Sequence, residues 1–175
     1  MNKINILLIS LLSIFSVTGQ NLLKDGVSGF EGEEVSGWWI QHKNIFHFSN
    51  KKANGGKHSL KFFRSPASGE KGSMQVHNKK AFKKPLKSGK YKLTAKVYLG
   101  SNIPAGFNFN FSGKNWLPVH VSFDGLRKKK WVEVSREFKV KKIVEGGVII
   151  AVAESEQYGG YGSFYLDDIK VVKIK

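Results

Sequence analysis

Tyr91-Lys92-Leu93-Thr94-Ala95-Lys96-Val97-Tyr98-Leu99 has the clearest alternating pattern in the chain. Its odd-numbered positions are apolar or aromatic, and the positions between them hold two lysines, a threonine and a tyrosine. Because successive side chains of a strand point to opposite faces, this pattern predicts a strand with one buried face and one solvent face.

Other parts of the chain share this strand-like character. Apolar residues nowhere keep a helical period over three turns, so at most a short helical piece is expected. Glycine pairs such as Gly55-Gly56 and Gly146-Gly147 separate the runs and indicate turns. The sequence therefore predicts an all-β fold, an antiparallel β-sandwich that forms a single domain. The further predicted strands are Ser59 to Phe63, Phe107 to Phe111, Leu117 to Phe123, Val132 to Val140 and Val148 to Ala153.

The N-terminus has the pattern of a secretory signal. Lys3 precedes an apolar run from Ile4 to Val17, and small residues follow at Thr18-Gly19. A run of about 14 residues is shorter than the roughly 20 that span a bilayer. We expect residues 1–19 to be a cleaved signal peptide and residues 20–175 to be one domain without a transmembrane segment. The protein is then secreted, periplasmic or held at the cell surface.

The charge of the chain is strongly positive. It carries 29 lysines and arginines against 13 acids, a formal net charge of +16. Such an excess speeds encounters with polyanions, and the point charge of lysine suits diffuse attraction better than bidentate recognition. An anionic polysaccharide is the expected partner, with no specific recognition of nucleic acid. A solvated surface that keeps the protein soluble is the alternative. The basic runs are Lys51-Lys52, Lys79-Lys80, Lys83-Lys84, Arg127 to Lys130 and Lys141-Lys142.

Two adjacent carboxylates, Asp167 and Asp168, interrupt the last strand-like run, from Gly162 to Ile174. Aspartate is depleted in strands because its short side chain competes for backbone hydrogen bonds. One of the two is expected to face the interior, where it needs a partner or a metal ion. A bound cation is the leading explanation, and a pair with a lysine is the alternative.

Several segments, in the same order along the chain, resemble jelly-roll carbohydrate-binding modules of the family 4, 9 and 22 type, which are galactose-binding-domain-like. The resemblance spans nearly all of the predicted mature chain. It implies a jelly-roll sandwich and a non-catalytic role in sugar binding. The segments are Asn21 to Gly26 with Phe30-Glu31, Gly56 to Phe62, Leu86 to Tyr98, Lys130 to Phe138 and Phe164 to Val171.

The resemblance also implies a structural calcium ion. In that family a closing aspartate, an acidic residue near the first strand and backbone carbonyls hold the metal. The corresponding ligands here are the carboxylates of Asp167 or Asp168 and of Glu31, with carbonyls near Gly29 and Lys57. Either of the next two glutamates is an alternative to Glu31. Calcium accepts six to eight oxygen ligands of these kinds.

Aromatic side chains are the expected sugar platforms, because their faces stack on sugar rings while amides bond to hydroxyl groups. Trp38 and Trp39 are adjacent, so one is expected to pack inside and the other to face solvent. The remaining aromatic candidates lie in polar loops, with loop packing as the alternative. The predicted ligand-binding residues are Trp39, Trp116, Tyr158, Tyr161, Gln75, His77, Asn108 and Asn110.

Enzymatic activity is a weaker hypothesis. The five histidines have no helical metal-binding spacing. The acids form no recognisable pair of glycosidase carboxylates. A polysaccharide lyase or hydrolase on this scaffold, using tyrosine and histidine with Arg64 or Arg127, stays open as an alternative. So does a cell-envelope interaction protein that has lost sugar binding. We predict a secreted, non-catalytic protein that binds an acidic or sulfated polysaccharide and holds a structural calcium.

Overall fold

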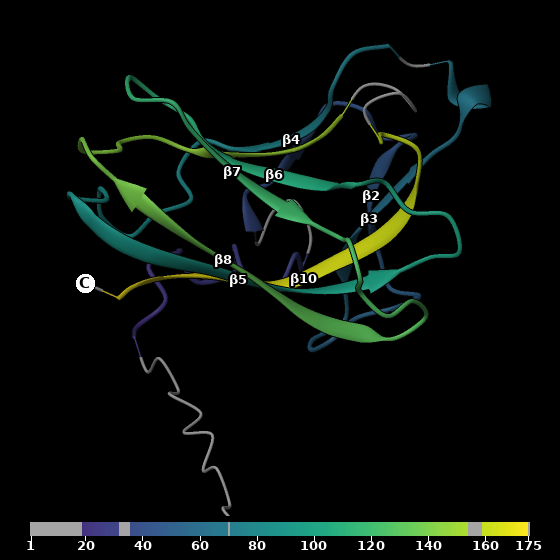
Figure 1. Ribbon diagram of the computed structural model, residues 1–175, viewed down its shortest axis with the longest axis horizontal. Helices are drawn as coiled ribbons and strands as arrows, with labels where there is room; N and C mark the ends of the chain where they lie inside the picture. The colour runs from purple at the N-terminus through teal and green to yellow at the C-terminus, as the bar shows by residue number, and fades with distance from the viewer. Residues whose placement is uncertain (1–18, 32–35, 70, 154–158, 175) are drawn as a thin grey trace, which may run out of the picture.

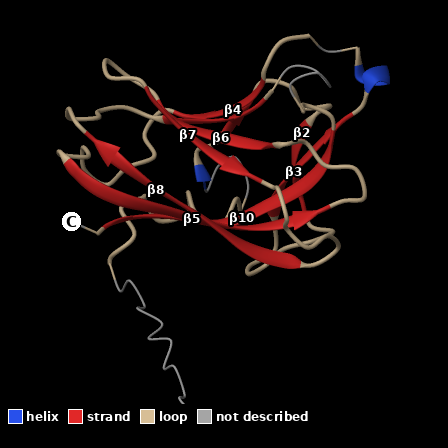
Figure 2. Cartoon of the chain, in the orientation of Figure 1, coloured by secondary structure: helices blue, strands red, loops and turns tan. Residues whose placement is uncertain are grey.

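The computed structural model describes residues 19–31, 36–69, 71–153 and 159–174. The predicted signal peptide therefore lies almost wholly outside the described residues. Strands dominate the described chain, and helical structure is confined to very short pieces such as the 3-10 turn η1 (Pro66–Ser68) (Figure 2). Among these residues, no helix has the length and apolar character needed to cross a membrane.

The strands form two antiparallel sheets of five strands each, stacked as two layers (Figure 1). One sheet, here called the front sheet, has the order β1-β4-β9-β6-β7, and the back sheet has the order β2-β3-β10-β5-β8. The front strands are β1 (Trp39–Ile40), β4 (Met74–Asn78), β9 (Val148–Val152), β6 (Gly106–Phe111) and β7 (Leu117–Ser122). The back strands are β2 (Phe46–Ser49), β3 (Ser59–Arg64), β10 (Gly162–Lys173), β5 (Gly89–Leu99) and β8 (Trp131–Val140). The predicted antiparallel β-sandwich is confirmed.

Sequence alternation located most of these strands. The predicted runs correspond to β3, β5, β6, β7, β8 and β9, with ends that differ by two residues or fewer, and β10 lies in the predicted closing run. The strands β1, β2 and β4 were missed. The first has only two residues, and the other two have four and five, so their alternation is too short to stand out.

Phenylalanine rings from both sheets meet in the core. Within the back sheet, the ring centroids of Phe62 and Phe164 are 5.2 Å apart, and Phe107 of the front sheet lies 6.2 Å from Phe164. A second contact joins the sheets further along, with Phe111 of the front sheet 5.0 Å from Phe138 of the back sheet. Burial of each such ring contributes about 1.5–3 kcal/mol, so these contacts hold the two layers in register.

The segment that precedes β1 connects β10 of the back sheet to the segment that follows β4 of the front sheet. The N–H of Leu22 donates to the carbonyl of Val171 on β10 (2.9 Å), and the N–H of Lys24 donates to the carbonyl of Ala81 (2.8 Å). Further along, the N–H of Ile169 donates to the carbonyl of Ser28 (3.0 Å). Both ends of the described domain therefore lie side by side along the back sheet.

The two adjacent tryptophans face opposite ways, as predicted. Trp38 is fully buried, its ring lies 5.4 Å from that of Phe30, and its Nε1–H donates to the carbonyl of Val27 (2.9 Å). Trp39 is 53% exposed.

We therefore expect the two tryptophans to differ sharply in their effect on stability. Replacing Trp38 by alanine removes a buried ring and should lower the free energy of unfolding by about 3–5 kcal/mol. Replacing Trp39 by alanine should change it by about 0.5 kcal/mol or less, because that ring faces water. Urea denaturation followed by far-UV circular dichroism measures both, and equal losses would contradict the assignment of faces.

Candidate functional site

The solvent face of the front sheet carries two rows of side chains in register across its strands. One row crosses the sheet from Trp39 through His77, Ile149 and Asn110 to Pro118. Adjacent strands lie about 4.8 Å apart, so a row of five spans about 19 Å. The sheet therefore offers an extended surface rather than a point-like site. The second row consists of Gln75, Ala151, Asn108 and His120.

The chemistry of this face is aromatic and amide. The ring of Trp39 lies 5.4 Å from the imidazole of His77 in a tilted arrangement. Nδ1 of His120 donates to the Oδ1 of Asn108 (3.0 Å), which orients that amide. The five described strands of the front sheet contain no lysine, arginine, aspartate or glutamate. Charge reaches this face only from the loops around it.

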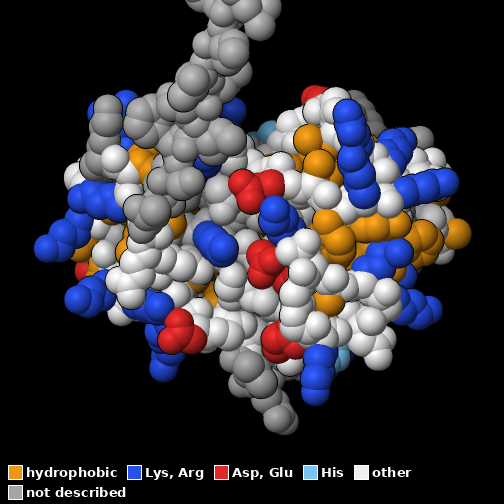
Figure 3. Space-filling view, turned by 90° about the horizontal axis from the view of Figure 1, so that it is seen from below, with side chains coloured by type: hydrophobic (Ala, Val, Ile, Leu, Met, Phe, Trp, Pro, Cys, Tyr) orange, Lys and Arg blue, Asp and Glu red, His pale blue; other side chains and the backbone are white. Residues whose placement is uncertain are grey.

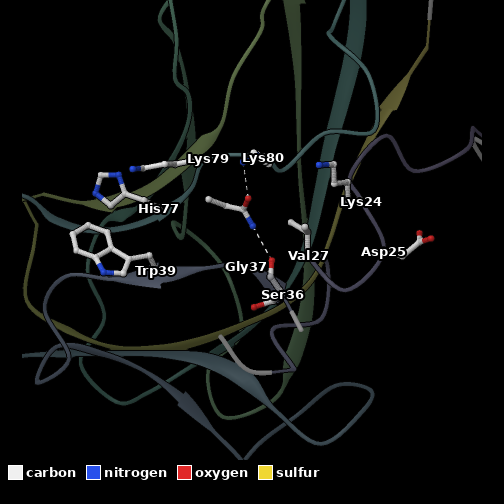
Figure 4. A pocket seen from close by; sticks show the side chains of 10 residues that line it. Lys24, Asp25, Val27, Ser36, Gly37, Trp39, His77, Lys79 and Lys80 are labelled. Carbon is white, nitrogen blue, oxygen red and sulfur yellow. Dashed lines mark hydrogen bonds between the residues drawn. The ribbon is translucent and has the colours of Figure 1, made fainter. Parts of the chain in front are cut away.

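A hollow of about 650 Å³ adjoins Trp39 and His77 at the edge of the sheet. Figure 4 shows those two rings with Lys79 on one side of it, and Lys24 with Asp25 on the other. The hollow thus places basic side chains beside an exposed indole ring.

A hydrogen-bonded asparagine fixes the position of the loops around this hollow. Asn78, the last residue of β4, donates from Nδ2 to the carbonyl of Ser36 (2.8 Å) and accepts at Oδ1 the N–H of Lys80 (3.1 Å). Asp25 forms an ion pair with Lys83 (2.9 Å), so its charge is already matched. Lys24, Lys79 and Lys80 therefore set the local charge.

The imidazole of His77 is neutral at physiological pH. Burial lowers its pKa, and the charges of Lys79 and His42 lower it further. Its Nε2 is buried and has no hydrogen-bond partner within the described part of the chain. A neutral ring beside Trp39 extends the apolar platform without adding charge.

The structure separates the loop aromatics from Trp39, because β7, which follows Trp116, is the edge strand opposite β1. Trp116 is 55% exposed and lies beside Lys141 and Val144, near the Val140 end of β8. Val140 pairs with Gly89 at the start of β5, whereas Phe164 of β10 pairs with Leu99 at its end. Those ends of β5 are about 33 Å apart at 3.3 Å per residue.

Tyr161 comes just before β10 and therefore lies at the opposite end of the sandwich from Trp116. Its ring centroid is 5.4 Å from the guanidinium of Arg64, which is itself buried and donates to the carbonyl of Ala153 (3.1 Å). Packing against Arg64 accounts for this tyrosine. Tyr158 lies outside the described residues.

The structure thus brings together five of the predicted ligand residues, Trp39, Gln75, His77, Asn108 and Asn110, on one face. Asn110 is only 7% exposed, so Trp39, His77, Gln75 and Asn108 are the members open to a ligand. Sequence reasoning missed their neighbours Pro118 and His120. Alternation in Leu117–Ser122 marks these two as solvent-facing, but only the pairing of β7 with β6 puts them beside the asparagines.

The two aspartates of β10 lie at a β-bulge. Three residue steps on β10, from Asp167 to Lys170, oppose two on β5, and Asp168 has a φ of 48°. Asp167 is only 1% exposed, and its Oδ2 accepts the N–H of Asn54 (2.8 Å). Oδ2 of Asp168 accepts Nδ2–H of the same asparagine (2.6 Å). The bulge breaks the strict alternation expected for a strand, so both carboxylates meet one loop.

Glu31 lies against a neighbouring turn. Its carboxylate accepts the N–H of Lys57 (3.0 Å) and of His58 (3.4 Å), and Nδ1 of His58 lies 3.5 Å away. Burial raises the pKa of Glu31, but these hydrogen bonds and the charge of His58 outweigh it and the pKa is lowered. Gly56 has a φ of 63°, a left-handed conformation that favours glycine, and a Cβ there would displace the carboxylate of Glu31.

The segments predicted to hold calcium therefore lie near one another, but their side chains are differently engaged. Ser28, next to Gly29, donates its hydroxyl to the carbonyl of Ile169 (2.6 Å) beside the bulge. Glu31 faces amide donors, and within the described ranges no three acidic or histidine side chains are grouped as a metal site. The alternatives to Glu31, residues 33 and 34, lie outside the described residues.

No protein-family model matches this sequence, and no curated protein does. Several solved structures, in contrast, match the fold of this chain. A family 16 carbohydrate-binding module superposes with a TM-score of 0.54 at 16% identity, covering 87% of this chain and 100% of the module. The CBM22-1 xylan-binding domain from Paenibacillus barcinonensis Xyn10C gives 0.54 at 16% identity, covering 85% and 92%. The protein has the jelly-roll fold of carbohydrate-binding modules.

A third module with this fold is TmCBM61, solved in complex with β-1,4-galactotriose. It superposes with a TM-score of 0.51 at 18% identity, covering 89% of this chain and 99% of the module. The likeness covers 92% or more of each of these three modules. The predicted jelly-roll architecture is confirmed.

The buried carboxylate of the jelly roll predicts a pH effect. The pKa of Asp167 is raised from 3.8 to about 6. Burial is the main cause and the charge of Asp168 adds to it, while the backbone hydrogen bonds from Asn54 and Asp168 offset part of the rise. Between pH 3.8 and about pH 6, Asp167 therefore keeps a proton in the folded state that it has lost in the unfolded state. The raised pKa therefore makes stability fall as pH rises through that window.

In metal-free buffer, the wild type should lose on the order of 1–3 kcal/mol of stability relative to Asp167→Asn as pH rises from about 4 to about 6. The asparagine does not titrate, so the difference between the two proteins isolates this group from the histidines. Urea unfolding at several pH values measures it. A difference that stays constant, or that grows in favour of the wild type, would contradict a raised pKa.

Proposed function

We propose that this protein is a non-catalytic carbohydrate-binding protein and that a polysaccharide binds across the solvent face of the front sheet. The observation that carries this proposal is the in-register row that begins at the exposed Trp39 and His77 and ends at Pro118, with Gln75 and Asn108 in the row beside it. Solved modules with the same fold include one described as xylan-binding and one bound to β-1,4-galactotriose, which supports the same role.

The side chains on this face suit a sugar chain. Trp39 presents an apolar ring for the C–H face of a pyranose. Gln75 and Asn108 each offer both a donor and an acceptor for hydroxyl groups. The length of the longer row, about 19 Å, favours several consecutive sugar units over a single terminal one.

The acids of the described chain argue for binding without cleavage. Glycoside hydrolysis needs two carboxyl groups flanking the bond that breaks. The strands of the front sheet contribute none, and the nearest acid at the hollow, Asp25, is paired with Lys83. We therefore rank a lyase or hydrolase, and an envelope protein without sugar binding, below a binding protein.

We propose an acidic or sulfated polysaccharide as the ligand of this exported protein. Three lysines, Lys24, Lys79 and Lys80, line the hollow next to Trp39 and give the site its charge. The net charge of +16 favours encounter with a polyanion. Export rests on the predicted signal over residues 1–19.

Calcium at the β10 bulge is part of the same proposal. Asp167 is buried, and no ion pair within the described chain neutralises it. Asp167 and Asp168 would hold the ion together with main-chain oxygens of the adjacent loops, because the oxygens of Glu31 already accept N–H donors. Bound calcium would supply the positive charge that this buried carboxylate lacks.

Trp39 provides the sharpest test of the binding face. Trp39→Ala should weaken binding at least tenfold, about 1.4 kcal/mol, because it removes the stacking platform. Trp116→Ala is a matched control, since that ring is equally exposed but lies at one end of the sandwich. Its effect should be less than about twofold.

Affinity electrophoresis in gels that contain alginate, pectin, chondroitin sulfate, xylan or galactan would identify the ligand, and isothermal titration would give the ratios. If Trp116→Ala removes binding while Trp39→Ala does not, the site lies at the loop end and the proposal is wrong. Release of new reducing ends or of unsaturated uronates would instead favour the enzyme.

Calcium should stabilise the folded protein through Asp167. At a free concentration one hundred times its dissociation constant, a ligand of the native state adds about 2.7 kcal/mol, which raises the melting temperature by several degrees. Asp167→Asn should lose most of this increase, and magnesium should give little of it. Thermal melts in calcium, magnesium and chelator measure the effect. Identical melts in calcium and chelator would refute the calcium site.

A further inference from the structure

The solvent face of the back sheet carries a row that the proposed function does not use. It crosses all five strands in register, from His47 through Lys61, Tyr165 and Tyr98 to Trp131. Such a row spans about 19 Å at the usual strand spacing. It lies on the opposite side of the sandwich from Trp39.

Four aromatic residues of this face, Phe63, Tyr98, Trp131 and Tyr165, are here called the aromatic strip; the last three have adjoining rings, and Lys61 lies between Phe63 and Tyr165. Tyr98 meets Trp131 at 5.8 Å and Tyr165 at 6.0 Å, in both cases edge to face. Phe63 is 48% exposed. Figure 3, which views the molecule from the back-sheet side, shows hydrophobic side chains gathered at one end with basic side chains around them.

Lysines stand over the strip. Nζ of Lys52 lies 4.3 Å from the ring centroid of Tyr98. Nζ of Lys61 lies 5.8 Å from that of Phe63 and 5.9 Å from that of Tyr165. The exposed run 127–130, one arginine and three lysines, leads directly into Trp131. Cation–π contacts hold these ammonium groups beside the rings.

The acidic side chains near the aromatic strip do not neutralise the positive charge of Lys52 and Lys61. Glu133, one position along β8 on the same face, pairs with Lys96 (3.2 Å). Asp167 is buried and accepts the N–H of Asn54. Consistent with a positive environment, burial lowers the pKa of His47 and the charges of Lys61 and Lys51 lower it further.

We propose that the aromatic strip is a second binding surface, and that its ligand is a polyanionic glycan bearing carboxylate or sulfate groups. The rings offer apolar contact to pyranose faces, and Lys52 and Lys61 offer partners to the anionic substituents. A second copy of this chain is a poor occupant, because both copies are strongly basic and repel each other.

Single-stranded nucleic acid is the other polyanion with flat rings, and the geometry disfavours it. Base binding uses open aromatic faces on which successive bases stack. Tyr98 instead meets its two neighbours edge to face and carries Lys52 over its own ring. The cations over the strip are lysines, which attract diffuse anions without the planar fork of arginine.

A second surface changes what the protein does to a polymer. The front and back faces point in opposite directions, so two glycan chains can bind to one domain at once. The protein then links chains, and its apparent affinity for a dense matrix exceeds the affinity of either face alone. This inference goes beyond the proposed function, which needs only the front face.

The test compares charge variants of equal net charge on the intact protein. Lys52→Gln with Lys61→Gln removes the cations over the strip, and Lys84→Gln with Lys87→Gln removes two exposed lysines outside it. Trp131→Ala with Tyr165→Ala removes rings and serves as a second variant. Binding is measured to heparin and to alginate at about 50 to about 500 mM salt, where exposed charges become screened. Oligodeoxythymidine is the nucleic-acid probe.

We expect the Lys52/Lys61 variant to lose at least fivefold in affinity for one of these glycans, and the Lys84/Lys87 control less than twofold. Trp39→Ala should lose the front-face component of glycan binding and keep the component that the Lys52/Lys61 variant loses. Wild-type protein should turn solutions of the polymer turbid by linking chains, and variants of either face should not.

Equal losses in the two lysine variants would overturn the proposal, as would tighter binding of oligodeoxythymidine than of either glycan. Loss of all glycan binding in Trp39→Ala would also overturn it, because the front face would then be the one site. If the strip variants abolish binding and Trp39→Ala leaves it intact, the strip stands and the front-face proposal fails.

Discussion

The packing of phenylalanine rings between the two sheets determines which side chains face solvent. Phe107 must turn inward to reach Phe164 of the opposite sheet, so its strand neighbour Asn108 must turn outward. The same rule on β5 buries Val97 and exposes Tyr98. A slip of one residue in either strand would exchange its two faces, and the core contacts prevent it. The packing of the core therefore determines which side chains form the two candidate surfaces.

The two faces differ in chemistry because their strands differ in composition. Front-sheet strands carry amides, histidines and one exposed tryptophan, and their basic neighbours come from loops. The back sheet carries lysines within its own strands, together with the aromatic strip. One small domain thus presents a mainly neutral surface and a cationic surface on opposite sides. At the bulge of Asp167 and Asp168, side chains no longer alternate strictly between the two faces of β10. The carboxylate of Asp167 is buried there and has no basic partner among the described residues.

Sequence patterns predicted the fold better than the site. Long alternating runs identified β5 and β8, and the opposite directions of Trp38 and Trp39 followed from their being adjacent. Register between strands has no signature in a single sequence, so the proximity of Trp39 and His77 to the asparagines came only from the structure. Trp116 was grouped with them because loop aromatics have few packing roles, yet the order of strands puts it at one end. The pairing of β8 with β5 likewise places Trp131 beside Tyr98, a neighbour that the sequence pattern of either strand alone does not indicate.

The indole N–H signals of the four tryptophans test the central claim most directly, since each reports on one location. A ¹⁵N–¹H spectrum recorded during titration with an acidic oligosaccharide separates them. We expect the signals of Trp39 and Trp131 to shift in two independent, saturable steps, while those of Trp38 and Trp116 stay in place. Shifts confined to Trp116, with Trp39 and Trp131 unchanged at saturation, would contradict binding on the sheet faces.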